Sequence, residues 1–533
     1  MGTKTPLMAM LRKAYRNAVL TNQRHTSNDS TEIFDAALDK HLTRRKFIRD
    51  AGRATIFLGV SGLIQACQKD DEITINKTNV DGMQAEIRST KKVAIIGAGI
   101  AGLNAAHTLS KAGFNNFTIF ESSNRTGGRM LSVQNVMGAG LTTEYGGEFI
   151  DSNHSDMIQL ASEFNLTLLD TQAPSETALI KDKYFFNGQN RTLAQVVAAI
   201  QPFVAQIQTN IDAVNSNNGA AQQFDNMSIS TYLTQLGMCG WIKELMEIAY
   251  ETEYGLSASV QSALNLLWLV SADLSGGTFE IFGVSDERYK IAGGNQQITT
   301  NLANLYQSKI QTSKTLETIS KQNGKYYLTF SGSSTCQIFD QILVTIPFTK
   351  LRQVGISANL PSWKTNAINN LGYGNNSKLF LGYNTRVWRT LGYSGYIFTD
   401  NGAQSGWDNT QLQAGTKGGF TVFSGGDTAV ALGNGSVQSQ VNTYLPKINQ
   451  LFAGTQAQYN NKSARIVWSS YAQSLGSYPC YLVGQGTTIS GNEIKRVGQM
   501  FFAGDHCSDE YQGYMNGGAE TGRTAATEML GFL

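Results

Sequence analysis

The chain has 533 residues, 41% of them hydrophobic and 10% aromatic, which is enough to bury the cores of more than one domain. Charged residues make up only 15%, below the roughly 25% that is usual for soluble domains, so the polarity of this globular chain rests on uncharged side chains. A net charge of +2, with no basic stretch interleaved with aromatic residues, excludes nucleic acid as an expected partner.

Residues 1–67 have the pattern of an export signal. A twin-arginine sequence, Thr43-Arg-Arg-Lys-Phe-Ile-Arg, precedes a weakly apolar run from Ala54 to Ile64. Its 11 residues are too few to span a bilayer as a helix and suit a signal h-region. The run ends in a sequence that resembles a bacterial lipobox, with Cys67 as the lipidated residue. We expect export by the twin-arginine route and a periplasmic or cell-surface lipoprotein that meets the membrane only through the lipid on Cys67.

The alternative for this stretch is a soluble amphipathic helix with a chance Arg-Arg pair. Residues 68–90, which follow, have a low apolar content and are expected to form a polar tether.

A strand, a glycine turn, a helix and a second strand then follow in order. Residues 92–99 read Lys-Val-Ala-Ile-Ile-Gly-Ala-Gly, a helix-like stretch extends to Lys111, and the apolar run 117–120 ends in Glu121. The glycines have GxGxxG spacing, and the acid lies 22 residues after Gly99. This combination is the fingerprint of a dinucleotide-binding βαβ unit.

Each part of the fingerprint has a physical role. Gly97 makes the tight turn, Gly99 lets the backbone approach a pyrophosphate, and Gly102 lets the helix pack on the strand. The helix N-terminus faces the phosphates, and Glu121 accepts hydrogen bonds from a ribose. The predicted contacts with the dinucleotide from this unit are Gly97, Ala98, Gly99, Ile100, Ala101, Gly102 and Glu121.

A second glycine turn with a cation, Gly127-Gly128-Arg129, comes directly after this acid. It can add backbone N–H donors and a fixed guanidinium to the same diphosphate. The order GxGxxG, Glu121, Gly127-Gly128-Arg129 resembles the flavin amine oxidase family, which comprises monoamine oxidases, polyamine oxidases and L-amino-acid oxidases. Further landmarks of that family follow in order: Gly293-Gly294, Gln341 to Pro347, Lys378, Trp468, Gly476-Ser-Tyr, Gln499 to His506, and Gly513 to Ala526.

The resemblance runs from about Lys92 to Leu533 and implies an α/β fold. It implies a Rossmann-like FAD-binding domain built from three discontinuous segments, 91–155, 278–345 and 465–533. An α+β substrate domain, 156–277 and 346–464, is inserted between them. Helical periodicity in the first insertion predicts helices at 157–164, 193–211 and 242–254.

The resemblance also assigns further contacts with FAD. The acid that follows Ala-Gly near the C-terminus binds the ribityl chain in this family; here it is Asp505, where many members have Glu, so its reach is shorter. Besides the βαβ unit, the implied contacts are Gly128, Arg129, Gly147, Glu148, Leu316, Gly504, Asp505 and Met515. Ser477 stands where animal monoamine oxidases carry a cysteine linked to the flavin, so FAD is expected to bind non-covalently.

The family resemblance implies roles for four more side chains. Tyr478 and Tyr514 stand where the family builds an aromatic cage that orients the amine, although each could simply pack. Lys378 matches the lysine that holds a water against the reactive flavin nitrogen; the alternative is a solvated strand lysine. Trp468 is expected to wall the cavity.

The position that carries a carboxylate-binding Arg in venom-type L-amino-acid oxidases is occupied here by Phe149. This favours amines without a carboxylate, although another arginine such as Arg389 could serve. Glu148 could attract a second cationic group or bond the flavin region.

The expected reaction is hydride transfer from the amine carbon to FAD, then reoxidation by O2 to H2O2, with the imine hydrolysed to aldehyde and ammonia. The alternatives are an L-amino-acid oxidase, more distantly a flavin desaturase, and, outside enzymes, a surface lipoprotein that keeps the fold without turnover.

The five cysteines have neither metal-ligand spacing nor the density of a disulfide framework, and no metal is expected. Cys480 and Cys507 could pair in an oxidising compartment, but nothing in the sequence requires it.

Overall fold

The computed structural model describes residues 90–533. The twin-arginine signal, Cys67 and all of the predicted tether except Thr90 lie outside the described residues. Over residues 90–533, no helix combines the length and the apolar character that crossing a bilayer requires.

The half of the molecule that contains the glycine fingerprint is built on a parallel sheet. Its strands, in spatial order, are β20 (Met500–Phe502), β13 (Gln341–Val344), β1 (Val93–Ile96), β2 (Phe117–Phe120) and β9 (Ile310–Gln311). All four pairings are parallel, and the strands come from well-separated parts of the chain. Both faces of β1 are buried, which explains why it reads as a continuous apolar run.

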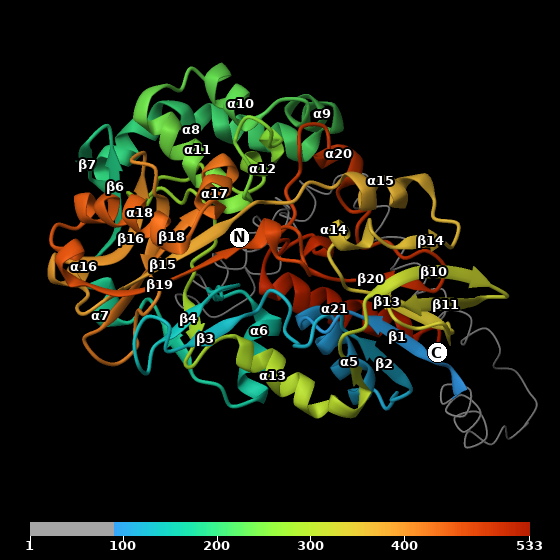
Figure 1. Ribbon diagram of the computed structural model, residues 1–533. Helices are drawn as coiled ribbons and strands as arrows, with labels where there is room; N and C mark the ends of the chain where they lie inside the picture. Colours follow the sequence, from blue (N-terminus) through green and yellow to red (C-terminus); the bar gives the residue numbers. More distant parts are fainter. Residues whose placement is uncertain (1–89) are drawn as a thin grey trace, which may run out of the picture.

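Different partners cover the two faces of this sheet (Figure 1). Val93 and Ile95 face a core made with four helices, α5 (Ile100–Lys111), α6 (Ser155–Glu163), α13 (Gln296–Leu305) and α21 (Met515–Leu530). Ala94 and Ile96 face a core shared with a four-stranded sheet. That sheet consists of β12 (Gln337–Phe339), β11 (Lys325–Phe330), β10 (Leu316–Gln322) and β14 (Gly355–Ser357), in that order.

Helices α5 and α21 pack closely because glycines of α21 face α5. A Cβ built on Gly522 would lie 2.1 Å from the carbonyl oxygen of Ala101, and one on Gly518 would lie 2.8 Å from Cγ2 of Ile100. No larger residue fits at either position without moving the helices apart, so the two helix N-termini are held side by side.

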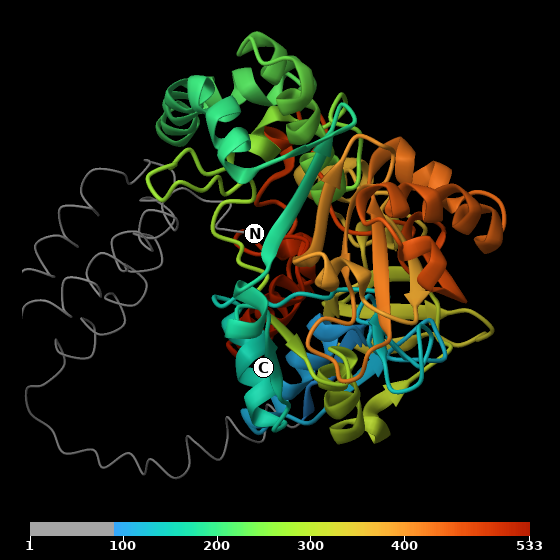
Figure 2. The ribbon, with the colours of Figure 1, turned by 90° about the vertical axis from the view of Figure 1, so that its left-hand side faces the viewer.

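The other half of the molecule contains a seven-stranded sheet. Its strands, in spatial order, are β19 (Tyr459–Val467), β15 (Ser377–Tyr383), β18 (Gly418–Ser424), β17 (Gln404–Asp408), β16 (Tyr393–Thr399), β6 (Ile180–Phe186) and β7 (Gln189–Arg191). A group of helices covers one end of it, at the top of Figures 1 and 2: α8 (Leu193–Ser216), α9 (Asn218–Asp225), α10 (Ile229–Gln235), α11 (Gly240–Tyr254) and α12 (Ala263–Leu267). Two more helices, α17 (Gly426–Gly433) and α18 (Val437–Leu451), pack on β15 and β19.

The three helices predicted in the first insertion are confirmed as α6 (Ser155–Glu163), α8 and α11. A capping box between Thr192 and Gln195 starts α8, which continues five residues beyond its predicted end at 211. Helix α11 ends at Gly255, whose φ of 78° is the left-handed conformation that glycine adopts without penalty.

The strands of the two halves are not divided at the predicted domain boundaries. Strand β14 lies within 346–464, yet it pairs with β10 in the sheet that covers the dinucleotide half. Strand β19 extends past residue 464 to Val467 in the seven-stranded sheet. The first insertion, predicted from its helices, also supplies strands β6 and β7 to that sheet.

Two short strand pairs connect the halves. Strand β3 (Ser132–Gln134) pairs with β4 (Thr142–Glu144), and β5 (Leu168–Asp170) pairs with β8 (Tyr289–Ile291), both antiparallel. The loop after β4 and the segment just before β8 both reach the cavity described below.

Candidate active site

A cavity lies at the carboxyl ends of the parallel strands, between the two halves of the molecule. It encloses about 1650 Å³ of non-atom space, part of it open to solvent. Gly97 after β1, Glu121 after β2, Thr345 after β13 and Gly504 after β20 all line it. Ligands of open α/β sheets bind at this edge.

Most of the predicted site residues lie on the wall of this cavity. They are Gly97, Gly99, Ile100, Ala101, Glu121, Gly128, Arg129, Gly147, Glu148, Phe149, Lys378, Trp468, Tyr478, Gly504, Asp505, Tyr514 and Met515. Ala98 and Gly102 support the wall from behind. Leu316 is not brought to it: its side chain is buried in the core beneath, between the parallel and four-stranded sheets.

The glycine turn has the geometry that its spacing predicts. Gly97 has a φ of 111°, and a Cβ there would lie 2.6 Å from Oγ1 of Thr345. A Cβ on Gly102 would lie 2.0 Å from the carbonyl oxygen of Gly97. A Cβ built on Gly99 would have no atom nearer than Cα of Gly128, at 4.0 Å, so there is open space above the N-terminus of α5. No side chain caps that N-terminus, so its N–H groups are available to an anion.

Glu121 is held in place by two backbone N–H groups. Its Oε2 accepts a hydrogen bond from Ala98 at 2.9 Å, and its Oε1 accepts one from Ser123 at 2.8 Å. The carboxylate is thereby fixed at the end of β2 and still lines the cavity, as a ribose-binding acid must.

Arg129, which is partly buried, and the buried Asp505 form a bidentate ion pair on the cavity wall. The guanidinium also donates to the carbonyl oxygen of Ser477 at 2.5 Å. Burial by itself would raise the pKa of Asp505, but the charge of Arg129, assisted by the neighbouring His506, outweighs it and holds this pKa at about 2. The pair therefore joins the second glycine turn to the segment that precedes α21.

The two cage tyrosines both line the cavity, and both are anchored on α11. The Tyr478 hydroxyl donates to the carbonyl oxygen of Thr252 at 3.1 Å, and the Tyr514 hydroxyl donates to Oε1 of Glu253 at 3.1 Å. Burial raises the pKa of both phenols well above 10, so both rings stay neutral. Trp468 is buried beside them, and its indole N–H donates to the carbonyl oxygen of Tyr145 at 3.2 Å.

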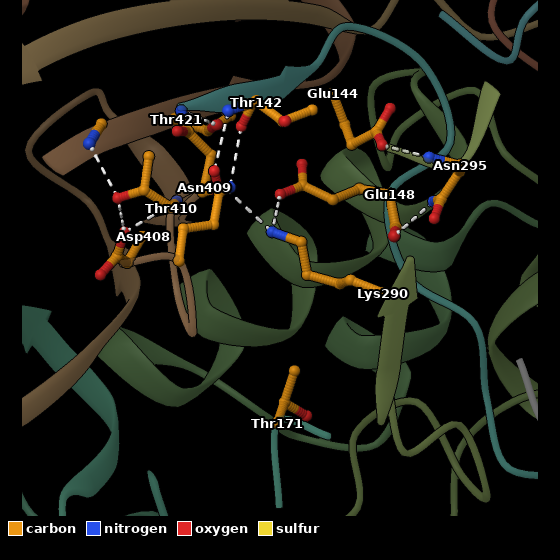
Figure 3. Close-up of polar contacts among 12 residues, drawn as sticks. Thr142, Glu144, Glu148, Thr171, Lys290, Asn295, Asp408, Asn409, Thr410 and Thr421 are labelled. Carbon is orange, nitrogen blue, oxygen red and sulfur yellow. Dashed lines mark hydrogen bonds and ion pairs between the residues drawn. The ribbon is translucent and has the colours of Figure 1, made fainter. Parts of the chain in front are cut away.

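Lys378, on β15, is 5% exposed, which excludes the solvated strand lysine. Its ammonium has three protein acceptors: the carbonyl oxygens of Glu144 at 3.2 Å and Gly146 at 2.9 Å, and Oε2 of Glu148 at 3.2 Å. The carboxylate of Glu148 also pairs with Lys290 at 2.8 Å (Figure 3). Sequence reasoning missed Lys290, since no motif marks a lysine in the short strand β8.

The remaining wall combines aromatic rings with carboxylates. Phe149 contacts Trp407 and Tyr396, with ring centroids 5.6 and 5.9 Å apart, and Trp407 contacts Phe423 at 5.2 Å. The wall residues that the sequence reasoning missed include Trp407, Phe423, Glu253 and Glu287. They lie on segments without a recognisable motif, and only the tertiary fold brings them to the cavity.

Arg389 does not lie on the cavity wall. Its guanidinium pairs bidentately with Glu176, at 2.7 and 2.9 Å. The alternative in which Arg389 binds a substrate carboxylate is therefore wrong for this conformation.

Among the described residues, none of the four cysteines is in a disulfide, and none lines the cavity. Cys480 and Cys507 are both buried and form no disulfide with each other. Residues 90–533 also contain no cluster of three or more metal-ligating side chains.

The cradle fits the phosphates and ribose of an adenine dinucleotide: a bare helix N-terminus, open space above Gly99, a fixed acid and a guanidinium held by an ion pair. Joined to an aromatic cavity, it defines a dinucleotide-dependent oxidoreductase.

Comparison with known proteins identifies the class more closely. The model of the flavin containing amine oxidoreductase family matches residues 100–530, so the chain belongs to that family. It is an oxidoreductase that acts on CH–NH groups with a flavin cofactor. The chain is 23% identical over 463 residues to flavin-containing amine oxidase A of Sus scrofa, covering 83% of this chain and 85% of that one. It is 22% identical over 465 residues to polyamine oxidase 4 of Oryza sativa subsp. japonica, covering 84% and 90%.

Solved structures have the same fold. Cyclohexylamine oxidase from Brevibacterium oxydans aligns with a TM-score of 0.72 at 20% identity, covering 83% of this chain and 99% of that one. Putrescine oxidase bound to putrescine aligns with a TM-score of 0.71 at 19% identity and the same coverage. The predicted α/β FAD-binding fold is thereby confirmed.

Proposed function

We propose that this protein is an FAD-dependent oxidase of primary or secondary amines that carry no carboxylate. When bound, FAD would accept the hydride of the amine carbon and pass the electrons to O2, giving H2O2 and an imine that hydrolyses to aldehyde and ammonia. The observation that carries this proposal is a pair of carboxyl groups on the cavity wall, those of Glu253 and Glu287, among aromatic rings. Burial raises the pKa of Glu287 to about 7, and a substrate ammonium beside it would favour its ionised form.

The residues of the wall suit an amine in three ways. Carboxylates attract a substrate ammonium, and the rings of Tyr478 and Tyr514 can hold the amine between their faces. Phe149, Trp407 and Phe423 exclude water from the carbon chain. Each of these groups is fixed by packing or by a hydrogen bond, so little ordering is needed when the substrate binds.

The L-amino-acid oxidase alternative is disfavoured by the cations present. Within residues 90–533, the guanidinium groups on the cavity wall are those of Arg125 and Arg129. Arg125 donates to the Tyr471 hydroxyl and to the carbonyl oxygens of Thr126 and Gly128, and Arg129 is paired with Asp505. A substrate carboxylate would find no free guanidinium, and the N–H donors of the Lys378 ammonium are already taken by three protein acceptors.

The test is a panel of amines and amino acids under anaerobic conditions, read as bleaching of the flavin absorbance. We expect bleaching by tyramine, benzylamine or putrescine, and rates at least about tenfold lower with L-phenylalanine at equal concentration. Faster bleaching by L-phenylalanine than by every amine would make the protein an L-amino-acid oxidase. A yellow protein that no compound bleaches would be a desaturase or a binding protein, which H2O2 measurements and hydrocarbon-like substrates then distinguish.

We infer that FAD is held without a covalent bond. Ser477 has a hydroxyl where a thioether would need a thiol, and this hydroxyl donates to Oδ1 of Asn376 at 2.6 Å. Cys480 is buried away from the cavity wall, so no thiol of the described chain is in a position to react with the cofactor.

We also propose export by the twin-arginine route and anchoring through lipid on Cys67. The sequence pattern supports this proposal, and a route that moves folded proteins suits an enzyme that acquires FAD before export. Cell fractionation tests it: the wild type should sediment with membranes, and Cys67→Ser should be released into the soluble fraction. Equal sedimentation of both proteins would contradict a lipid anchor at this residue.

A further inference from the structure

A carboxylate buried between two lysines stands on the cavity wall. Glu148 is 4% exposed; its Oε1 lies 2.8 Å from Nζ of Lys290, and its Oε2 lies 3.2 Å from Nζ of Lys378. Both lysines are buried as well, at 4% and 5% exposure. We refer to these three residues as the charge triad. It holds two positive charges and one negative charge.

Lys290 is the firmly anchored member of the triad. It lies in β8, which is paired with β5, and its ammonium donates a second hydrogen bond to the carbonyl oxygen of Asn409 at 3.0 Å (Figure 3). It also lies 5.5 Å from the ring centroid of Phe149. One end of Glu148 is therefore fixed by a side chain that does not itself line the cavity.

The turn after β8 holds the backbone of the same loop. Nδ2 of Asn295 donates to the carbonyl oxygens of Gly147 at 3.1 Å and Glu148 at 2.8 Å, and its backbone N–H donates to Oε1 of Glu144 at 2.7 Å (Figure 3). Because all three acceptors of Lys378 belong to residues 144–148, the segment that carries Lys290 and Asn295 also determines where the Lys378 ammonium lies.

The charges of the triad depend on one another. Burial by itself would raise the pKa of Glu148, but the charge of Lys290, followed by that of Lys378, lowers this pKa below its usual value and keeps the carboxylate ionised. Burial lowers the pKa of Lys378, and Lys290 lowers it further, while Glu148 and Glu144 oppose them. Without Lys290, Glu148 would neutralise Lys378; with it, the triad keeps a net charge of +1.

We propose that Lys290 is a positioning residue of the active site: it holds Glu148 in place and balances its charge, so that Lys378 presents an uncompensated positive charge to the cavity. The inference rests on the proposed function only in that Lys378 stands beside the bound flavin. A positive charge there favours the anionic, reduced form of the cofactor.

The test is the midpoint potential of the bound flavin in a double-mutant cycle, measured by reductive titration against reference dyes. Lys290→Met removes one positive charge and should shift the reduction equilibrium toward oxidised flavin by on the order of tenfold, about 30 mV for a two-electron couple. Glu148→Gln should shift it by a similar amount in the opposite direction. The double variant restores a net charge of +1 and should return to within about 10 mV of the wild type.

Two further variants separate positioning from folding. Lys290→Arg keeps the charge and should keep the wild-type potential. Lys325→Met breaks an exposed pair with Asp340 far from the cavity and should leave the potential unchanged. In the double variant the Lys378 ammonium keeps the carbonyl oxygens of Glu144 and Gly146 as acceptors, so the comparison with Glu148→Gln remains available even where Lys290→Met fails to fold.

Shifts of the two single variants in the same direction, or a double variant further from the wild type than either, would overturn the proposal and leave Lys290 with a packing role. Reductive titration needs no amine. The potential can therefore follow the predicted cycle in a protein that no amine bleaches, so failure of the proposed substrate and failure of the triad are separate results.

Discussion

Replacing Gly97 with alanine is expected to remove the flavin almost completely. The new Cβ would lie 2.6 Å from Oγ1 of Thr345, and the φ of 111° disfavours any side chain. The backbone of the turn must therefore move away from the position in which its N–H groups can bind the diphosphate. A shift that loses two backbone hydrogen bonds costs about 3 kcal/mol, roughly a hundredfold in affinity. The measurement is the FAD found in the supernatant after acid precipitation of purified protein, relative to the wild type.

Gly113→Ala is the matched control, because this glycine closes the helix of the same βαβ unit. Its φ is 86°, but a Cβ there has nothing within 4 Å, so the substitution brings only a conformational cost of about 1 kcal/mol. The control should remain as yellow as the wild type. Equal flavin content in Gly97→Ala and the wild type would place the cofactor elsewhere, and flavin that stays in the wild-type pellet would contradict non-covalent binding.

Replacing Arg129 with methionine is expected to destabilise the protein by about 3–5 kcal/mol, because Asp505 is then left as a buried, unpaired carboxylate. The measurement is the unfolding midpoint in urea at pH 7. Asp505→Asn in the same chain removes the stranded charge, so the double variant should regain part of this loss. Arg496→Met, which breaks an exposed pair with Glu528, should cost less than about 1 kcal/mol.

The ion pair between Arg129 and Asp505 also predicts how the stability of the protein depends on pH. The pKa of Asp505 is about 2 in the folded protein and close to 3.9 in an unfolded chain, so its stabilisation is fully present above about pH 4. It is lost as the pH falls through 2, and amounts to roughly 2.5 kcal/mol. In Arg129→Met the pKa of the buried carboxyl rises instead, so the loss of stability relative to the wild type should shrink below pH 4. If the difference in unfolding free energy between Arg129→Met and the wild type did not change with pH, the ion pair between Arg129 and Asp505 would be contradicted.

Much of the fold could be predicted from local patterns in the sequence. A GxGxxG turn and an acid after the second strand predict the βαβ unit, because only glycine accepts the φ of Gly97 or the contact at Gly102. Periodicity located α6, α8 and α11, since an amphipathic helix repeats its apolar face every turn. Strand β6 escaped notice, because its seven residues gain their burial from β16, which lies more than 200 residues further along the chain.

The residues of the candidate site also fall into those that local patterns predict and those that they do not. Residues within motifs, such as Glu121, Arg129 and Asp505, could be found because the phosphate and ribose contacts need particular residue types at particular spacings. Leu316 was assigned by family resemblance alone, and the structure places it in a core. The side chains that complete the cavity stand outside any motif, as Trp407 and Glu253 do.

By itself, therefore, the sequence determined the class of cofactor, the order of the elements around the cavity and the glycine turns and charged residues expected to bind the diphosphate. Each of these depends on contacts between residues close together in the chain or on backbone conformations open to a single residue type. Only the tertiary structure decided the charge of the substrate cavity and the partners of Lys378. Glu148 and Lys378 are 230 residues apart, and Lys290 and Glu148 are 142 apart. Such pairs meet only when separate sheets pack, and no local pattern encodes the distance between them.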